Sequence, residues 1–278
     1  MGRNTLMYAD IEAYVDTDVL LYKFGFACEQ STEWEDGMWT HTGNIDRAQS
    51  EFDNLIDTVF EDLAEWYGDD NVEIEMNMCF SSRAGSFRKL IWDGYKKSRK
   101  GKRKPVIMSD FRQWVEDCYS CISEPWLEGD DILGIWGATY DAPLKPTGNV
   151  KVMCSIDKDL MTVPGYHYNW DKRGMGVISV DREMAAKNFY LQTLSGDAVD
   201  EYPGCPTIGP KRGLKIIKDA LKNNVPLWEA VVKTFESHNR DERFALQMAR
   251  CAYILQPDDF DKELGSIELW SPRKDKGE

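Results

Sequence analysis

Long apolar runs are missing from this 278-residue chain, and no stretch reaches the length that a membrane-spanning helix needs. The N-terminus also lacks a basic segment followed by a hydrophobic one, which is the pattern of a secretory signal. These absences exclude the membrane and export classes, and we expect a cytoplasmic protein. The length suffices for one large domain or two closely packed ones.

Disulfide and zinc frameworks are missing too. The seven cysteines are scattered, and most lie in apolar contexts where a reduced thiol packs as a small hydrophobe. Cys118 and Cys121 have the spacing of half a zinc site, but no second pair completes it. Core packing is therefore the expected role of these cysteines.

Positive charge is in deficit, because the formal net charge is −14, which at first argues against a nucleic-acid binder. Residues 83–104 reverse that impression. They hold ten Lys or Arg and a single acid, Asp93, so this basic island carries a formal charge of +9 and the rest of the chain −23. Such segregation suits a surface that holds a polyanion at one place. A merely solubilising loop explains this concentration of charge less well.

The spacing of apolar residues predicts alternating helices and strands. One apolar face recurs over 46–67, which is typical of a long amphipathic helix, and strict alternation over 72–80 predicts a strand. Further strands are predicted at 11–15 and 150–156. Residues 31–44 are polar and are interpreted as a loop, and 166–170 as an edge strand. From residue 181 the pattern is helical, with helices at 184–194, from about 211, at 227–237 and at 242–255.

Carboxylates gather at the junctions between these predicted elements. They fall into four groups: Asp16; Glu128, Asp130 and Asp131; Asp157 and Asp159; Asp197 and Asp200. Taken singly, an acidic first turn is common on ordinary helices, and a simple helix cap by Asp16 or Asp18 explains the first group equally well. Their recurrence favours a functional role. Hard oxygen ligands without convergent histidines suit Mg²⁺ or Mn²⁺, and two such ions about 3.5–4 Å apart stabilise both oxygens of a phosphoryl displacement.

Basic and glycine-rich segments supply complementary groups. Within the basic island, Lys96 or Arg99 is placed to offset charge on a scissile phosphate, and the Tyr95 ring offers a surface on which a base can stack. Lys102, Arg103 and Lys104 extend the same charge.

A second candidate anion site is the glycine hairpin, residues 204–213. Gly204 and Gly209 punctuate a tight turn that opens a helix near Lys211. Free backbone N–H groups at that helix start attract anions. Three cations stand beside them: Lys211, Arg212 and Lys215.

In this order and spacing, the motifs resemble those of the flap endonuclease or 5′-nuclease family, and most closely the phage 5′–3′ exonucleases. The resemblance covers nearly the whole chain. Its motifs are Val15-Asp16 with Leu20-Leu21-Tyr22-Lys23, Tyr95-Lys96 with Arg99, Glu128-Gly129-Asp130-Asp131, Asp157-Lys158-Asp159, Gly196-Asp197 with Asp200, Gly204 to Gly213, and Ala249-Arg250 through Asp261-Lys262-Glu263 to Leu269-Trp270. Each motif alone is a weak signal, and the combination is specific.

The resemblance implies an α/β fold with a PIN-like nuclease core and a mostly parallel sheet at about residues 1–180. It implies an arch at about 83–105, through which a 5′ end passes. A helix-three-turn-helix that grips duplex DNA phosphates is then expected within residues 181–278, packed on the core. In relatives this motif often carries a K⁺ ion held by backbone carbonyls.

Site roles follow from the resemblance by position. Asp16, Glu128, Asp130 and Asp157 match the first metal site. Asp159, Asp197 and Asp200 match the second, and Asp131 is expected to be shared or to support a ligand. The expected cofactors are two Mg²⁺ or Mn²⁺ ions, and the groups expected to take part in catalysis are Lys96, Arg99, Asp130 and Asp157.

One departure from the family pattern stands out. Many relatives carry an aspartate after the strand that here ends Met78-Cys79-Phe80, and this chain has Ser81-Ser82. The first metal site therefore has one carboxylate fewer, and either Asp16 compensates or activity is reduced.

The leading hypothesis is a monomeric, metal-dependent 5′-nuclease acting on DNA, or on the RNA of a primer hybrid, in the host cytoplasm. The alternative is a catalytically weakened, structure-specific DNA-binding protein of the same fold, which a decayed metal site at Ser82 would favour. The other retained carboxylates argue against it. A PIN-type ribonuclease explains the acids but neither the basic island nor the glycine hairpin.

Overall fold

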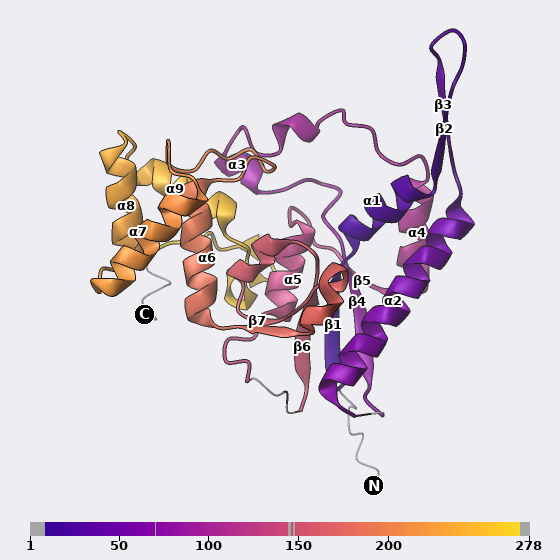
Figure 1. Ribbon diagram of the computed structural model, residues 1–278, viewed down its shortest axis with the longest axis horizontal. Coiled ribbons are helices and arrows are strands. Elements are labelled where there is room, and N and C mark those ends of the chain that lie inside the picture. The colour runs from indigo at the N-terminus through magenta and orange to yellow at the C-terminus, as the bar shows by residue number, and fades with distance from the viewer. Residues whose placement is uncertain (1–8, 70, 144–145, 147, 273–278) are drawn as a thin grey trace.

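The computed structural model describes residues 9–69, 71–143, 146 and 148–272, and its centre is a six-stranded sheet in the order β5-β4-β1-β6-β7-β8 (Figure 1). All neighbouring strands are parallel except β7 and β8. The prediction of an α/β protein with a mostly parallel sheet is confirmed. The strands are β1 (Ile11–Asp16), β4 (Ile74–Cys79), β5 (Ser120–Ile122), β6 (Val150–Cys154), β7 (Gly165–Tyr168) and β8 (Ile178–Val180).

Strand β1 lies at the middle of the sheet and is almost wholly buried, as expected for a parallel strand covered on both faces. The chain adds β4 on one side of β1 and later β6 on the other. The winding of the sheet therefore reverses at β1. In open α/β sheets, the carboxyl ends of the strands at such a switch point border the ligand crevice.

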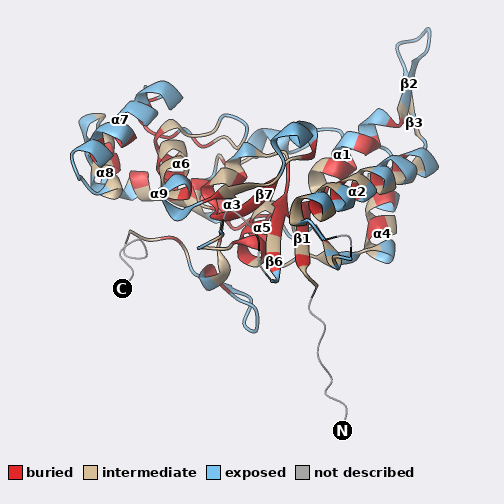
Figure 2. Ribbon diagram, turned by 60° about the horizontal axis from the view of Figure 1, so that its bottom comes forward, coloured by how far each residue is buried: buried red, intermediate tan, exposed pale blue. Residues whose placement is uncertain are grey.

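Helices cover both faces of the sheet (Figure 2). Helices α1 (Thr17–Ala27), α2 (Ile45–Tyr67) and α4 (Met108–Cys118) pack together on one face. Their core includes Phe52, whose ring meets those of Phe111 and Trp114 edge-on at about 6 Å. Helix α5 (Gly129–Gly137) packs against β1, β4 and β6 on the other face. None of the described helices is long and apolar enough to cross a membrane.

A helical region lies at one end of the sheet, in orange and yellow in Figure 1. It contains α6 (Arg182–Ser195), α7 (Pro210–Lys222), α8 (Leu227–Ser237) and α9 (Glu242–Ala252), packed around the buried Trp270. The short helix α3 (Arg88–Ile91) contacts α9. Short elements complete the chain: η1 (Lys97–Arg99), η2 (Lys158–Thr162), η3 (Trp170–Met175), η4 (Pro257–Asp259), β9 (Phe260–Asp261) and β10 (Ser266–Ile267).

Two expectations about local structure were wrong. Residues 31–44 are not a loop, because β2 (Glu29–Glu33) and β3 (Trp39–Gly43) form a hairpin that projects from the body (Figure 1). Its strands are polar because no core lies under them, so the sequence shows no alternation of apolar residues. Strand β7 is not at the edge, since the three-residue β8 pairs beyond it.

Candidate active site

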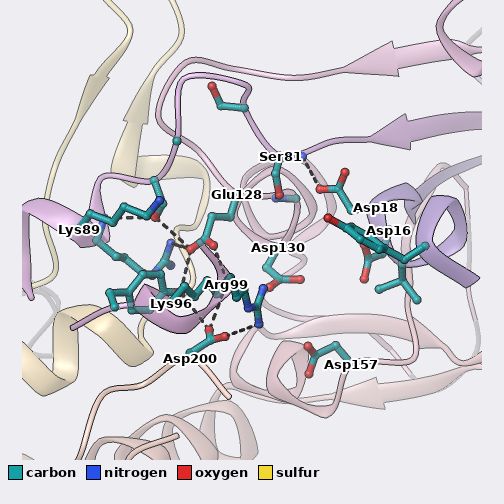
Figure 3. Close-up of a pocket in the computed structure, with 18 of the residues that line it drawn as sticks. Asp16, Asp18, Ser81, Lys89, Lys96, Arg99, Glu128, Asp130, Asp157 and Asp200 are labelled. Atoms are coloured by element: carbon teal, nitrogen blue, oxygen red, sulfur yellow. Dashed lines mark hydrogen bonds and ion pairs between the residues drawn. The ribbon is translucent and has the colours of Figure 1, made fainter. Parts of the chain in front are cut away.

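A cleft of about 1520 Å³ opens along the carboxyl ends of β1, β4 and β6 and the start of α5 (Figure 3). Its walls carry both signs of charge. Its carboxylates include Asp16, Asp18, Glu128, Asp130, Asp157, Asp159 and Asp200, and Lys96 and Arg99 are among its cations. The structure therefore brings together residues that lie up to 184 positions apart in the sequence.

One serine hydroxyl ties the ends of β1 and β6 together. Ser155 Oγ donates a hydrogen bond to Asp16 Oδ2 at 2.8 Å and accepts one from the Asp157 backbone N–H at 3.0 Å. Asp157 Oδ1 in turn accepts from the Asp159 N–H at 2.8 Å. The Ser155 hydroxyl thus fixes Asp16, at the end of β1, relative to Asp157, which follows β6.

Several of these carboxyl groups are costly to ionise. Burial raises the pKa of Asp16 to about 7, and the charges of Asp18 and Asp157 add to the effect. Burial, with Asp16 and Asp157 nearby, raises the pKa of Asp130 well above its usual value. Burial also raises the pKa of Asp159 to about 7. A divalent cation among these oxygens relieves the repulsion, so the donor set fits a hard metal ion.

The carboxylates line the same cleft but do not converge on a common metal position. Within the described ranges, no three His, Cys, Asp or Glu side chains stand close enough together to form a ligand set. Glu128 and Asp200 instead turn toward cations of the basic island.

Glu128, the N-cap residue of α5, has cationic and hydroxyl partners. Its Oε2 accepts from Tyr95 OH at 2.8 Å and Arg88 Nη1 at 3.0 Å, and its Oε1 from Lys96 Nζ. Burial opposes ionisation, but the charges of Lys96 and Arg88 prevail and lower the pKa of Glu128 to about 2.

Lys96 links Glu128 to Asp200. Its Nζ lies 3.3 Å from Asp200 Oδ2, and Arg99 Nη2 lies 2.9 Å from Asp200 Oδ1 (Figure 3). The backbone of Lys96, at φ 49°, also donates to the Asp200 carbonyl at 2.9 Å. The two cations therefore occupy the carboxylates that the metal ions would need.

Asp131 and Asp197 do not line the cleft. Asp131 is fully buried, accepts two hydrogen bonds of 2.7 Å from the Arg88 guanidinium, and accepts the Glu128 backbone N–H at 3.1 Å. It does not face the cleft as a shared carboxylate would, and its contacts are those of the other expected role, support of the ligand Glu128. Asp197 Oδ1 accepts from the N–H groups of Val199 and Asp200 and so orders the loop that presents Asp200.

Tyr95 is also corrected, because only 3% of it is exposed and its ring packs into the core of the helical region. It has no free face on which a base can stack. Its hydroxyl donates toward Glu128 and lies 3.0 Å from Asp200 Oδ2, so Tyr95 helps to position these carboxylates.

Sequence reasoning missed three residues of this site. Arg88 counted only as one exposed cation of the basic island, although the apolar residues around it were a signal that this part is buried. Asp18 was considered only as a helix cap, and Ser155, one of the last residues of the predicted strand 150–156, drew no attention. Their partners come from other strands and helices, so local sequence does not reveal them.

The exposed part of the basic island runs from Lys97 to Lys104 across the cleft mouth and is anchored at both ends. At its far end, Arg103 Nη1 lies 2.6 Å from Glu29 Oε2, at the base of the β2–β3 hairpin. Lys102 and Lys104 are exposed and make no ion pair within the described part of the chain.

The glycine hairpin has a tightly packed half and an open half. Gly204, at φ 62°, stacks its backbone on Gly196, and a Cβ on Gly204 would lie 2.2 Å from the Gly196 nitrogen. Gly209, the N-cap residue of α7, has φ −93°, and no protein atom lies within 4 Å of a Cβ there. A positive φ is therefore not the reason for Gly209. Beyond it, Lys211, Arg212 and Lys215 are exposed on the first turns of α7.

A mostly parallel α/β core with an acidic cleft at its switch point is the architecture of a PIN-like nuclease. No protein-family model matches the chain. It is 24% identical to the exodeoxyribonuclease of Enterobacteria phage T3 over 287 residues, which cover 93% of this chain and 92% of that protein. It is also 24% identical to the exonuclease of Escherichia phage T7 over 286 residues, with the same coverage.

The fold agrees with these matches. A flap endonuclease of bacteriophage T5, solved in a complex with DNA and metal ions, superposes with a TM-score of 0.53 at 15% identity, covering 89% of this chain and 90% of that one. The resemblance to the 5′-nuclease family that the motifs predicted is confirmed by these matches.

Proposed function

We propose that the protein is a divalent-metal-dependent 5′-nuclease that hydrolyses DNA phosphodiester bonds as a 5′–3′ exonuclease or flap endonuclease in phage DNA replication or processing. The observation that carries this proposal is the meeting of Asp16, Asp130 and Asp157 at the switch point, opposite Lys96. The names of the T3 and T7 relatives support the reaction class.

The residues that would hold the cofactor follow from the cleft. Asp16, Glu128, Asp130 and Asp157 would bind one Mg²⁺ or Mn²⁺ ion, and Asp159 and Asp200, with Asp197 nearby, a second. Bound there, such ions lower the pKa of water and stabilise charge on the reacting phosphate oxygens. The protein orients Asp16 and Asp157 through Ser155.

In this proposal Lys96 and Arg99 change partners when substrate arrives. In the free protein they neutralise Glu128 and Asp200. With metal ions held by these carboxylates, the two side chains would be free to meet the scissile phosphate. The exposed arch cations and the start of α7 would hold the DNA backbone. We expect a monomer in the host cytoplasm, with an RNA–DNA hybrid as a further substrate and K⁺ at the glycine hairpin.

The test is cleavage of 5′-labelled duplex and flap DNA with Mg²⁺, with Mn²⁺ and with EDTA. We expect short 5′ products with either metal and none with EDTA. DNA binding without cleavage under every metal condition would instead establish the weakened DNA-binding alternative, which no observation here favours.

The Lys96→Ala variant should slow chemistry more than it weakens binding. Loss of one preorganised charge at the reacting group typically lowers kcat by about 10²–10³-fold. We expect such a loss in single-turnover cleavage, with little change in the Kd for DNA measured in Ca²⁺. Lys97→Ala, which removes the exposed neighbouring cation, is the matched control and should leave kcat unchanged. Equal losses in kcat and affinity would contradict a role at the scissile phosphate.

Neutralising Lys102, Arg103 and Lys104 together should weaken DNA binding and flatten its salt dependence. Each lost phosphate contact lowers the slope of log K against log salt by about 0.7–0.9. We expect most of the change from Lys102 and Lys104, because Arg103 is already paired with Glu29. Titrations at several salt concentrations measure this slope, and an unchanged slope would exclude DNA contact by the arch.

The Gly209→Val, Lys211→Ala double variant should impair duplex and flap cleavage while sparing short single strands. The space beside Gly209 is open in the free protein, so a valine fits there but blocks close approach of a phosphate. Loss should be similar across unrelated DNA sequences, because backbone contacts carry no base information. A lowered melting temperature with equal losses on both substrate types would identify a plain structural loop instead.

A further inference from the structure

Asp18 is a half-buried carboxylate of the cleft. It lies in the first turn of α1, two residues after Asp16, and lines the cleft beside Asp16 and Gly129. Its Oδ2 accepts a hydrogen bond of 2.7 Å from the backbone N–H of Ser81, the second residue after β4 (Figure 3). The Asp18 carboxylate, carried by the helix that follows β1, therefore lies at the carboxyl end of the neighbouring strand β4.

That strand end is where the chain departs from the family pattern. Ser81 offers no carboxylate, and its Oγ accepts the N–H of Gly129 at 2.9 Å. Asp18 fills the space between these groups. A Cβ on Gly129 would lie 3.5 Å from Asp18 Oδ2, so the Asp18 carboxylate packs against the first turn of α5. Gly129 itself stands between Glu128 and Asp130 in the sequence.

The charge of Asp18 has no cationic partner. Among the described residues, no Lys or Arg nitrogen lies within 4.0 Å of it, whereas Glu128 and Asp200 both have such partners. Arg112, which lies nearby, is paired with Glu116 at 2.8 Å. The hydrogen bonds of Asp18 come from one residue, Ser81, and leave part of the hydrogen-bonding capacity of the carboxylate unused. The Asp18 carboxylate can therefore still accept a cation in the cleft as a partner.

We infer that Asp18 supplies to the first metal ion the carboxylate that the Ser81-Ser82 pair lacks, either as a direct ligand or through a bound water. This inference rests on the proposed function. It replaces the expectation that Asp16 compensates, because Asp16 already belongs to the set at the ends of β1 and β6. Asp18 is the additional carboxylate, and it reaches the end of β4 from α1.

The experiment measures Mn²⁺ binding to the full chain without DNA, by calorimetry, and needs no catalytic readout. Asp18→Asn keeps the shape and the oxygen that accepts the Ser81 N–H but removes the charge. We expect the Kd for the tighter Mn²⁺ ion to rise about tenfold or more, the scale on which groups around a metal tune its affinity. The melting temperature without metal should stay unchanged or rise, because a charge that the neighbouring carboxylates repel is lost.

A swap gives the sharper result. Adding Ser81→Asp to the Asp18→Asn background puts a carboxylate back at the same strand end, and it should restore most of the lost affinity. The matched charge control is Asp57→Asn, an exposed acid on α2 that should leave the Kd unchanged. Failure of the swap to restore affinity, or an unchanged Kd in Asp18→Asn, overturns the inference.

The proposed function is tested separately in the same titration. If Asp157→Ala weakens Mn²⁺ binding and Asp18→Asn does not, the metal site stands and Asp18 merely holds the end of β4. If neither variant changes the Kd, or the wild type takes up no Mn²⁺, the metal site itself is wrong and both proposals fail.

Discussion

Replacing Asp157 with alanine is expected to abolish turnover while leaving DNA binding intact. Asp157 lies just after β6, faces Asp16 and Asp130 across the cleft, and is fixed by the Ser155 hydroxyl. Without it, a metal ion loses a ligand and the electrostatic stabilisation that it gives the reacting phosphate. Losses of this kind cost about 10³-fold or more in kcat. Single-turnover cleavage of a labelled flap in Mg²⁺ measures the effect.

The binding measurement makes this prediction specific. Removal of one negative charge from the cleft does not weaken contact with a polyanion, so the Kd for the same flap in Ca²⁺ should stay equal or decrease. Asp57→Ala removes an equivalent charge from the outside of α2 and should leave both quantities unchanged. Undiminished cleavage by Asp157→Ala would disprove the assignment of the cleft as the nuclease site.

Replacing Arg88 with methionine is expected to lower the free energy of unfolding by about 3–5 kcal/mol, the usual cost of breaking a buried ion pair from one side. Only 3% of Arg88 is exposed. Its guanidinium holds both oxygens of Asp131 at 2.7 Å and the carbonyls of Cys251 and Tyr253 at 3.1 and 2.5 Å. The variant leaves a buried carboxylate and two carbonyls without this donor. Urea denaturation followed by circular dichroism measures the change.

A double variant separates pairing from packing. Arg88→Met with Asp131→Leu removes both charges, and replacement of a buried pair by apolar groups is often nearly neutral. We therefore expect the double variant to be more stable than Arg88→Met alone. Arg88→Lys keeps the charge but cannot reproduce the two parallel hydrogen bonds, so it should fall between the wild type and Arg88→Met. A loss below about 1 kcal/mol in Arg88→Met would contradict a structural role for this cluster.

The position of Arg88 also has a functional consequence. It joins α3, the start of α5 and the end of α9, and so connects the helical region to Glu128. Disorder in this cluster would misplace Glu128 together with Tyr95 and Lys96. Arg88 therefore positions the site without facing the substrate.

The sequence by itself determined the elements whose signal is local. The period of apolar residues predicted α2 to within one residue, and the alternation over 72–80 predicted β4, because each helix or strand must bury one face. The order of the acidic motifs was enough to predict the resemblance to the 5′-nuclease family. The carboxylates predicted at the ends of β1 and β6, Asp16 and Asp157, both line the cleft.

Only the tertiary structure decided which members of each motif face the cleft. Asp130 and Asp131 are neighbours in sequence, yet α5 turns one toward the carboxylates and the other toward Arg88. In the basic island, Lys97 is exposed and Arg88 is buried, although composition treats them alike. The polar hairpin of β2 and β3 and the interior place of β7 depend on pairing between strands. These outcomes rest on contacts between distant segments, and the burial and charge pairing that such contacts impose are not encoded in any local pattern.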